Sequence, residues 1–212
     1  RVELEVQLIA DVAVIGVPNA GKSSLLASLT GANPDVADYP FTTIDPVLGV
    51  VKRKSKDIVI VEIPGLIENA HKGVGLGDEF LRHAQRTGMT LHLLNGLSED
   101  ILADYKQTKQ EMTLYDRKLI EKPEVVAITK VDLPQVKEIL QETVSKLASE
   151  GIHAIGISSM SGEGTKELVV KLEDNLANKD IQKGNVDSES APKIPIIIAE
   201  PKTGRVVVES DG

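Results

Sequence analysis

The chain contains no cysteine, and only 2% of its 212 residues are aromatic. The first absence excludes a disulfide framework and any metal site built on cysteine, and the second means that the core must be mostly aliphatic. No apolar run approaches the ~20 residues that a membrane helix needs. The net charge of −8 argues against a generally basic surface for nucleic acid. We expect a globular, monomeric, cytoplasmic protein without a membrane span.

Short apolar runs alternate with longer amphipathic ones. They predict strands at 11–15, 47–52, 57–63, 89–95, 123–129 and 152–158, and helices at 22–29, 77–87, 100–119, 135–149 and 163–178. This alternation predicts an α/β fold with a mainly parallel sheet that is covered on both faces. The two strands within 47–63 are joined by a short basic turn, which predicts an antiparallel hairpin at one edge. That turn is either a solvated hairpin tip or a small contact for RNA or a partner.

The main domain is predicted over residues 9–178. Residues 1–8 alternate in polarity, and we expect them to be a strand arriving from a domain that is absent here. Residues 179–195 are mostly polar and predict a linker. Residues 196–212 contain two strand-like runs and predict a hairpin that begins a second unit. Because the chain begins at Arg1 rather than Met, we expect it to be a fragment.

One segment has the pattern G-x-x-x-x-G-K-S: Gly16, Val17, Pro18, Asn19, Ala20, Gly21, Lys22 and Ser23. It follows an apolar strand and opens a predicted helix, and this context makes a phosphate cradle because backbone N–H groups point at the phosphate oxygens. Lys22 would reach the β- and γ-phosphates, and the Ser23 hydroxyl would coordinate Mg²⁺. The alternative is a plain strand-to-helix turn with a lysine facing solvent.

Two later segments bear on the choice of base: Thr129-Lys130-Val131-Asp132 and Ser158-Ser159-Met160, each at the end of a predicted strand. The Asp132 carboxylate can accept hydrogen bonds from the ring N–H and the amine of guanine, whereas adenine offers no such donor pair. The aliphatic stem of Lys130 would lie over the base, and a backbone N–H in the serine segment would bond the guanine oxygen. The alternatives are a turn with an N-capping aspartate and an ordinary polar loop.

Two loops are predicted to sense the γ-phosphate. The first contains Phe41, Thr42, Thr43, Ile44 and Asp45, and the second contains Glu62, Ile63, Pro64 and Gly65. The Thr43 hydroxyl would complete the Mg²⁺ shell, and the Gly65 N–H would bond the γ-phosphate. Loss of that phosphate would release both loops, as in a molecular switch. The alternative for both is an ordinary connecting loop.

The chain resembles the G domain of the Obg GTPases from about residue 4 to 178. Besides the phosphate cradle, the matching stretches are Ile9–Val12, Ala37–Thr43, Ile63–Glu68 and Phe80–His83. The resemblance implies a three-layer P-loop NTPase fold with one antiparallel edge strand, slow hydrolysis of GTP to GDP, Mg²⁺ dependence and association with the large ribosomal subunit during its assembly. It implies Ser23 and Thr43 as metal contacts, and Lys22, Thr43 and Gly65 as the residues that assist catalysis.

Two positions depart from the pattern that the resemblance implies. Glu62 stands where the family usually has an aspartate that holds a Mg²⁺-bound water, and Thr129 where it usually has an asparagine. Leu66 occupies the position of the water-orienting glutamine of many GTPases, so basal turnover should be slow. Asn19 either holds a K⁺, as in K⁺-stimulated GTPases, or only suits the turn. A binding module with negligible hydrolysis, an ATPase and a sister GTPase remain the alternatives.

Overall fold

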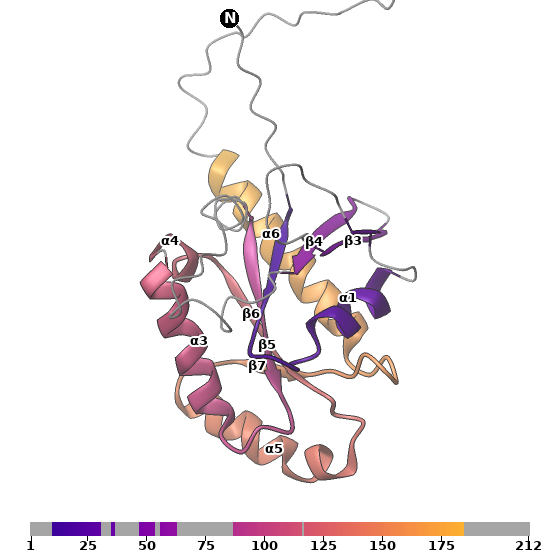
Figure 1. Ribbon diagram of the computed structural model, residues 1–212. Helices are drawn as coiled ribbons and strands as arrows, with labels where there is room; N and C mark the ends of the chain where they lie inside the picture. The colour runs from indigo at the N-terminus through magenta and orange to yellow at the C-terminus, as the bar shows by residue number, and fades with distance from the viewer. Residues whose placement is uncertain are drawn as a thin grey trace, which may run out of the picture.

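The computed structural model describes residues 10–30, 35–36, 47–53, 56–62, 87–115 and 117–184. Its strands are β1 (Val12–Ile15), β2 (Asp35–Val36), β3 (Val47–Val51), β4 (Ile58–Glu62), β5 (Met89–Asn95), β6 (Glu124–Thr129) and β7 (Ala154–Gly156). Its helices are α1 (Lys22–Thr30), α3 (Ile101–Tyr115), α4 (Arg117–Ile120), α5 (Pro134–Ser149) and α6 (Thr165–Gly184) (Figure 1).

The strands form one seven-stranded sheet in the order β2-β3-β4-β1-β5-β6-β7. β3 runs antiparallel to both of its neighbours, and the other pairs are parallel. The predicted hairpin over 47–63 is therefore confirmed, as is the mostly parallel α/β sheet. The sequence did not predict β2, which has only two residues and lies outside β3 at the edge of the sheet.

Helices cover both faces of the sheet, which confirms the three-layer arrangement. Along β1, Val12 and Val14 join the core on the side of α1 and α6, whereas Ala13 and Ile15 join the core on the side of α3 and α4. Successive strand residues point to opposite faces, so a strand buried on both faces must be apolar throughout. Figure 1 shows α1 and α6 on one side of the sheet and α3 and α4 on the other.

The core is aliphatic, as the composition predicted. The buried hydrophobic residues of the described chain are alanine, valine, isoleucine, leucine and methionine. From α6, Leu168, Leu172 and Leu176 face this core because a spacing of four residues places side chains on one helix face. Burying Leu168 and Leu172 fully contributes about 1.5–3 kcal/mol each.

Two helix boundaries differ from the predictions. The helix predicted over 100–119 is divided into α3 and α4. α6 continues past residue 178 to Gly184, so the start of the predicted linker is helical. Residues 179–183 contain neither glycine nor proline, and a polar sequence of that kind can extend a helix. Residues 77–86 of a predicted helix, residues 1–9 and residues 185–212 lie outside the described chain.

Candidate nucleotide-binding site

The predicted site segments converge at the carboxyl edge of the parallel strands. The P-loop, residues 16–23, follows β1, Glu62 ends β4, and residues 129–132 and 158–160 follow β6 and β7. β1 lies between β4 and β5, where the chain passes from one half of the sheet to the other. Ligands of open α/β sheets bind at this kind of switch point. The remaining predicted contacts, Phe41, Thr42, Thr43, Ile44, Asp45, Ile63, Pro64 and Gly65, lie outside the described residues.

The P-loop backbone has the geometry of a cradle. Gly16 has a φ of +147°, and a Cβ atom built there would lie 2.4 Å from the carbonyl oxygen of Leu93. No other residue fits at that position. Asn19 has a φ of 60°, in the left-handed region that asparagine tolerates better than most residues. The Ala20 N–H donates to the carbonyl of Val17 at 3.2 Å, which closes the turn.

The Lys22 ammonium folds back over this loop. Its Nζ donates to the carbonyl oxygens of Gly16 at 3.1 Å and Val17 at 3.2 Å. Both acceptors belong to the P-loop, so the charge already stands at the phosphate cradle. Phosphate oxygens are charged acceptors and form stronger hydrogen bonds with an ammonium than neutral carbonyls do. A bound phosphate can therefore compete for this lysine.

Ser23 and Glu62 meet beside the cradle. The Ser23 hydroxyl donates to Glu62 Oε1 at 3.0 Å. The Glu62 side chain is buried, with 6% of the residue exposed, and its Oε2 atom has no hydrogen-bond partner among the described residues. A buried carboxylate oxygen without a partner is unfavourable unless a cation or a proton compensates it. Hydroxyl and carboxylate oxygens are ligands that Mg²⁺ accepts, so these residues fit a magnesium site.

Thr129 lies at the end of β6, near Gly21 of the P-loop. It is buried, and its Oγ1 donates to the carbonyl oxygen of Leu94 at 3.2 Å. Its side chain lies 3.9 Å from the position that a Cβ on Gly21 would take. The hydroxyl therefore ties β6 to β5, and any side chain at position 21 would come into van der Waals contact with Thr129.

Asp132 is the free carboxylate of the site. It is exposed, and no hydrogen bond or ion pair with another described residue engages it. The N-cap position of α5 is occupied by Leu133, without a side-chain cap, and Pro134 begins the helix. The capping alternative for Asp132 is therefore wrong. Lys130 has a φ of 64°, and this left-handed residue turns the chain between β6 and α5.

The serine segment is organised around Ser158. This residue is buried, and its Oγ accepts the N–H groups of Met160 at 3.2 Å and Ser161 at 3.0 Å. Its own N–H donates to the carbonyl of Glu163 at 2.9 Å. Within the predicted trio, the Ser159 N–H is then the one backbone N–H that has no acceptor among the described residues. It is the donor left for a guanine oxygen.

The two base-side segments are joined through the backbone. The Val131 N–H donates to the carbonyl of Ile157 at 3.2 Å, and the Ile157 N–H donates to the carbonyl of Ile128 at 2.8 Å. Asp132 directly follows Val131, and Ser159 lies two residues after Ile157. Their spacing is therefore set by the β6–β7 pairing.

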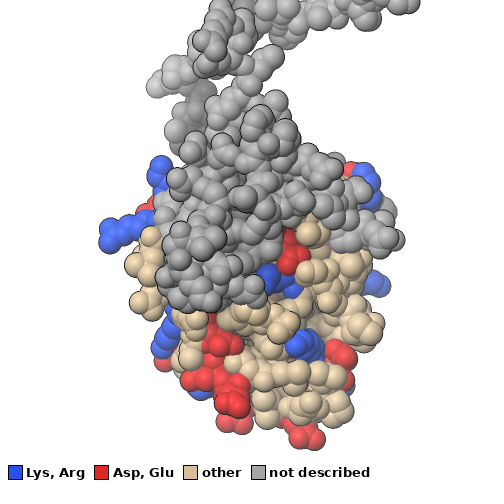
Figure 2. Space-filling view, viewed as in Figure 1, with Lys and Arg blue, Asp and Glu red and all other residues tan. Residues whose placement is uncertain are grey.

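The basic turn between β3 and β4 pairs with acidic residues of this chain. Lys52 lies 2.7 Å from Asp57, and Arg53 forms two hydrogen bonds to Glu173 of α6. The hydrogen bond from Arg53 lowers the pKa of the Glu173 carboxyl. On the face in Figure 2, acidic and uncharged side chains separate the described Lys and Arg side chains. These observations favour the solvated hairpin tip over an RNA contact.

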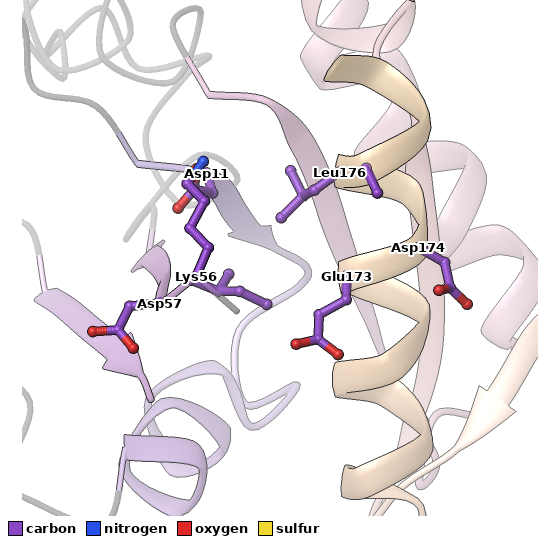
Figure 3. Close-up of a pocket in the computed structure, with 8 residues that line it drawn as sticks. Asp11, Lys56, Asp57, Glu173, Asp174 and Leu176 are labelled. Atoms are coloured by element: carbon purple, nitrogen blue, oxygen red, sulfur yellow. The ribbon is translucent and has the colours of Figure 1, made fainter. Parts of the chain in front are cut away.

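A pocket of about 330 Å³ lies at the amino ends of the parallel strands, whereas the P-loop follows their carboxyl ends. Its lining residues are Asp11, Lys56, Asp57, Ile58, Glu173, Asp174, Leu176 and Ala177. Figure 3 shows Lys56 beside Asp11, where the two charged groups are 3.5 Å apart. Because Asp57 and Glu173 are also paired with cations of this chain, the pocket has the character of a surface ion-pair cluster and takes no part in the predicted site.

Sequence reasoning missed a buried polar cluster beneath α3. His92 is fully buried and donates from Nδ1 to Glu124 at 3.2 Å, while Tyr105 stacks on its ring at 5.0 Å. Burial lowers the pKa of His92. Burial opposes ionisation of Glu124, but hydrogen bonds from His92 and Tyr105 and the charge of Lys109 lower its pKa overall. A histidine inside an otherwise apolar strand was the available signal.

The fold and the site can be compared with known proteins. Residues 11–130 match the family model described as "50S ribosome-binding GTPase". The GTPase Obg of Dehalococcoides mccartyi is 48% identical over 198 residues, which cover 93% of this chain and 46% of that protein. The chain belongs to the Obg GTPase family. The GTPase Obg of a Synechococcus species is 40% identical to this Obg-family chain, over 92% of it and 56% of the relative.

The Obg-family chain spans about half the length of the curated relatives it matches. Among solved structures, a single-residue variant of Aquifex aeolicus Era bound to GDP.AlF4⁻ has a TM-score of 0.58 and 22% identity, covering 88% of this chain and 60% of Era. The G domain of the T. maritima FeoB iron transporter has a TM-score of 0.57 and 24% identity, covering 79% of this chain and 99% of that domain. These likenesses show the fold. None of the helices described here is long and apolar enough to cross a membrane.

Proposed function

We propose that this chain is a G domain that binds GTP with Mg²⁺, hydrolyses it slowly to GDP and acts as a switch in assembly of the large ribosomal subunit. The observation that carries the proposal is the free Asp132 carboxylate at the same sheet edge as the P-loop. Asp132 would read guanine, and the Ser159 N–H would bond its oxygen. The ribosomal part is supported by membership of the Obg family and by the match to the family of 50S ribosome-binding GTPases.

The chain's residues would act mainly by positioning. Phosphoryl transfer to water needs an in-line arrangement and stabilisation of the charge that develops on the phosphate oxygens. Lys22 would exchange the carbonyls of Gly16 and Val17 for phosphate oxygens, while the P-loop amides would hold the β-phosphate. A Mg²⁺ held by Ser23 and Thr43 would neutralise part of the phosphate charge. Gly65 would bond the γ-phosphate. A K⁺ at Asn19, a monomeric state and a cytoplasmic location stay proposals.

A second candidate is a nucleotide-dependent binding module whose hydrolysis is negligible. The residue that favours it is Leu66, which cannot orient a water as glutamine does. On this alternative the bound nucleotide only sets which surface is exposed. Single-turnover hydrolysis of GTP separates the two, because a switch enzyme converts the bound GTP to GDP over minutes to hours and the module leaves it intact.

The binding step is tested by displacement of a fluorescent GDP analogue by GDP, GTP and ATP, with and without Mg²⁺. Displacement by GDP and GTP but not by ATP is the expected result, since only guanine offers the donor pair that Asp132 accepts. Equal displacement by ATP would leave a generic P-loop nucleotide binder. The effect of Mg²⁺ on GDP affinity reports whether Ser23 and Glu62 support the metal.

A further inference from the structure

Glu62 differs from the other buried polar groups of the site because only half of its carboxylate is engaged. Oε1 accepts the Ser23 hydroxyl at 3.0 Å. Oε2 is also buried but has no hydrogen-bond partner within the described part of the chain. This unpartnered atom lies beside the hydroxyl predicted to hold the metal. An oxygen that is withdrawn from water and still without a partner is suited to a cation.

We infer that Glu62 binds the nucleotide-associated divalent cation directly through Oε2, as an inner-sphere ligand next to Ser23. The inference rests on the proposed function. A hydroxyl that binds a metal through a lone pair keeps its proton, so Ser23 can continue to donate to Oε1. Neighbouring ligands of an octahedral Mg²⁺ with bonds of about 2.1 Å lie roughly 3 Å apart. Ser23 Oγ lies 3.0 Å from Oε1 of the same carboxylate, so the two side chains are close enough to share one ion.

The side chain of glutamate is one methylene longer than that of aspartate, and this length lets the carboxylate at position 62 reach the ion directly. An aspartate at the end of β4 would stop about one carbon–carbon bond, roughly 1.5 Å, further from the ion, and a water would fill the gap. Glu62 would replace that water with an anionic oxygen. Mg²⁺ gives up its waters reluctantly, whereas Mn²⁺ binds carboxylate ligands more readily. The site should therefore favour Mn²⁺ over Mg²⁺ more strongly than its Glu62→Asp variant does.

The test counts the waters bound to the metal. The GDP complex is loaded with Mn²⁺ in water enriched in ¹⁷O, and the broadening of the electron paramagnetic resonance lines gives the number of coordinated waters. Glu62→Asp should gain one bound water, and its preference for Mn²⁺ over Mg²⁺ should fall several-fold. Glu142→Asp on the exposed face of α5 is the matched control and should resemble the unsubstituted chain. Equal water numbers in the unsubstituted chain and Glu62→Asp would overturn the inference.

Glu62→Gln and a metal-free measurement separate this inference from the proposed function. Glu62→Gln keeps the size of the side chain but removes its charge, so Mn²⁺ affinity in the GDP complex should fall at least tenfold. GDP binding is also measured without metal, in the presence of a chelator that removes divalent cations. An unsubstituted chain that fails to bind GDP contradicts the proposed function, and the inference falls with it. GDP binding together with unchanged Mn²⁺ affinity in Glu62→Gln contradicts the inference alone.

Discussion

Replacing Asp132 with asparagine should weaken GDP binding while leaving the fold unchanged. The carboxylate is exposed and has no hydrogen-bond partner among the described residues, so its loss should change the free energy of unfolding by less than about 0.5 kcal/mol. In the proposed complex it accepts two hydrogen bonds from guanine. Each hydrogen bond to a charged group contributes about 1.5–3 kcal/mol, so two contribute about 3–6 kcal/mol. That range corresponds to a loss of affinity of roughly 10²- to 10⁴-fold.

The assay is competition against a fluorescent GDP analogue, with thermal unfolding measured on the same samples. Asp174→Asn is the matched control. Asp174 is also exposed, but it lies on α6 beside the pocket at the amino ends of the strands. Xanthine carries a carbonyl where guanine carries an amine, and an asparagine amide can donate to it. Asp132→Asn should therefore prefer XDP to GDP. Unchanged GDP affinity in Asp132→Asn, or an equal loss in Asp174→Asn, would refute the reasoning.

Three further substitutions have defined outcomes. Gly16→Ala should abolish GDP binding and lower the melting temperature, because its Cβ would meet the Leu93 carbonyl at 2.4 Å; wild-type binding would contradict this. Thr129→Val should cost about 0.5–1.5 kcal/mol in urea unfolding by removing the hydrogen bond from its hydroxyl to the Leu94 carbonyl, but should not change the preference for GDP over ATP. Burial lowers the pKa of His92 in the fold, so the unfolded chain binds more protons below about pH 6.5. Stability should then fall with decreasing pH by up to about 1.4 kcal/mol per pH unit. His92→Gln should reduce this dependence of the unfolding free energy on pH. If urea unfolding of the variant and of the unsubstituted chain depends equally on pH between 7.5 and 5.5, His92 is not its source.

The sequence predicted the structure best at positions where a short pattern of residues alone determines the local conformation or burial. β1 is apolar throughout because both of its faces are buried, and Gly16 is required by one close backbone contact. Both signals are local, and a sequence pattern can capture them. The free state of Asp132 was harder to predict, because a turn with a capping aspartate has the same letters. Only the place of Leu133 at the N-cap decides between them.

Other features depend on which residues the fold brings together. β2 is two residues long and exists through its pairing with β3, so no periodic pattern marks it. His92 and Glu124 are far apart in sequence and meet only because β5 and β6 pair in one register. The end of α6 was predicted too early because a polar helix exposed to solvent resembles a linker in composition. The direct contact between Ser23 and Glu62 likewise requires β4 beside β1.

The proposed nucleotide site spans a central strand and a strand at the edge of the sheet. β1, which precedes the phosphate cradle, has a strand on each side, whereas β7, which precedes the loop proposed to bond guanine, is three residues long and pairs on one side only among the described strands. Strands at an edge open locally at lower free energy than central ones. Amide hydrogen exchange should therefore be faster along β7 than along β1. In the proposed complex, we expect the contacts to the base to break before the contacts to the phosphates. The reason is that the edge strand β7 opens more readily than the central strand β1.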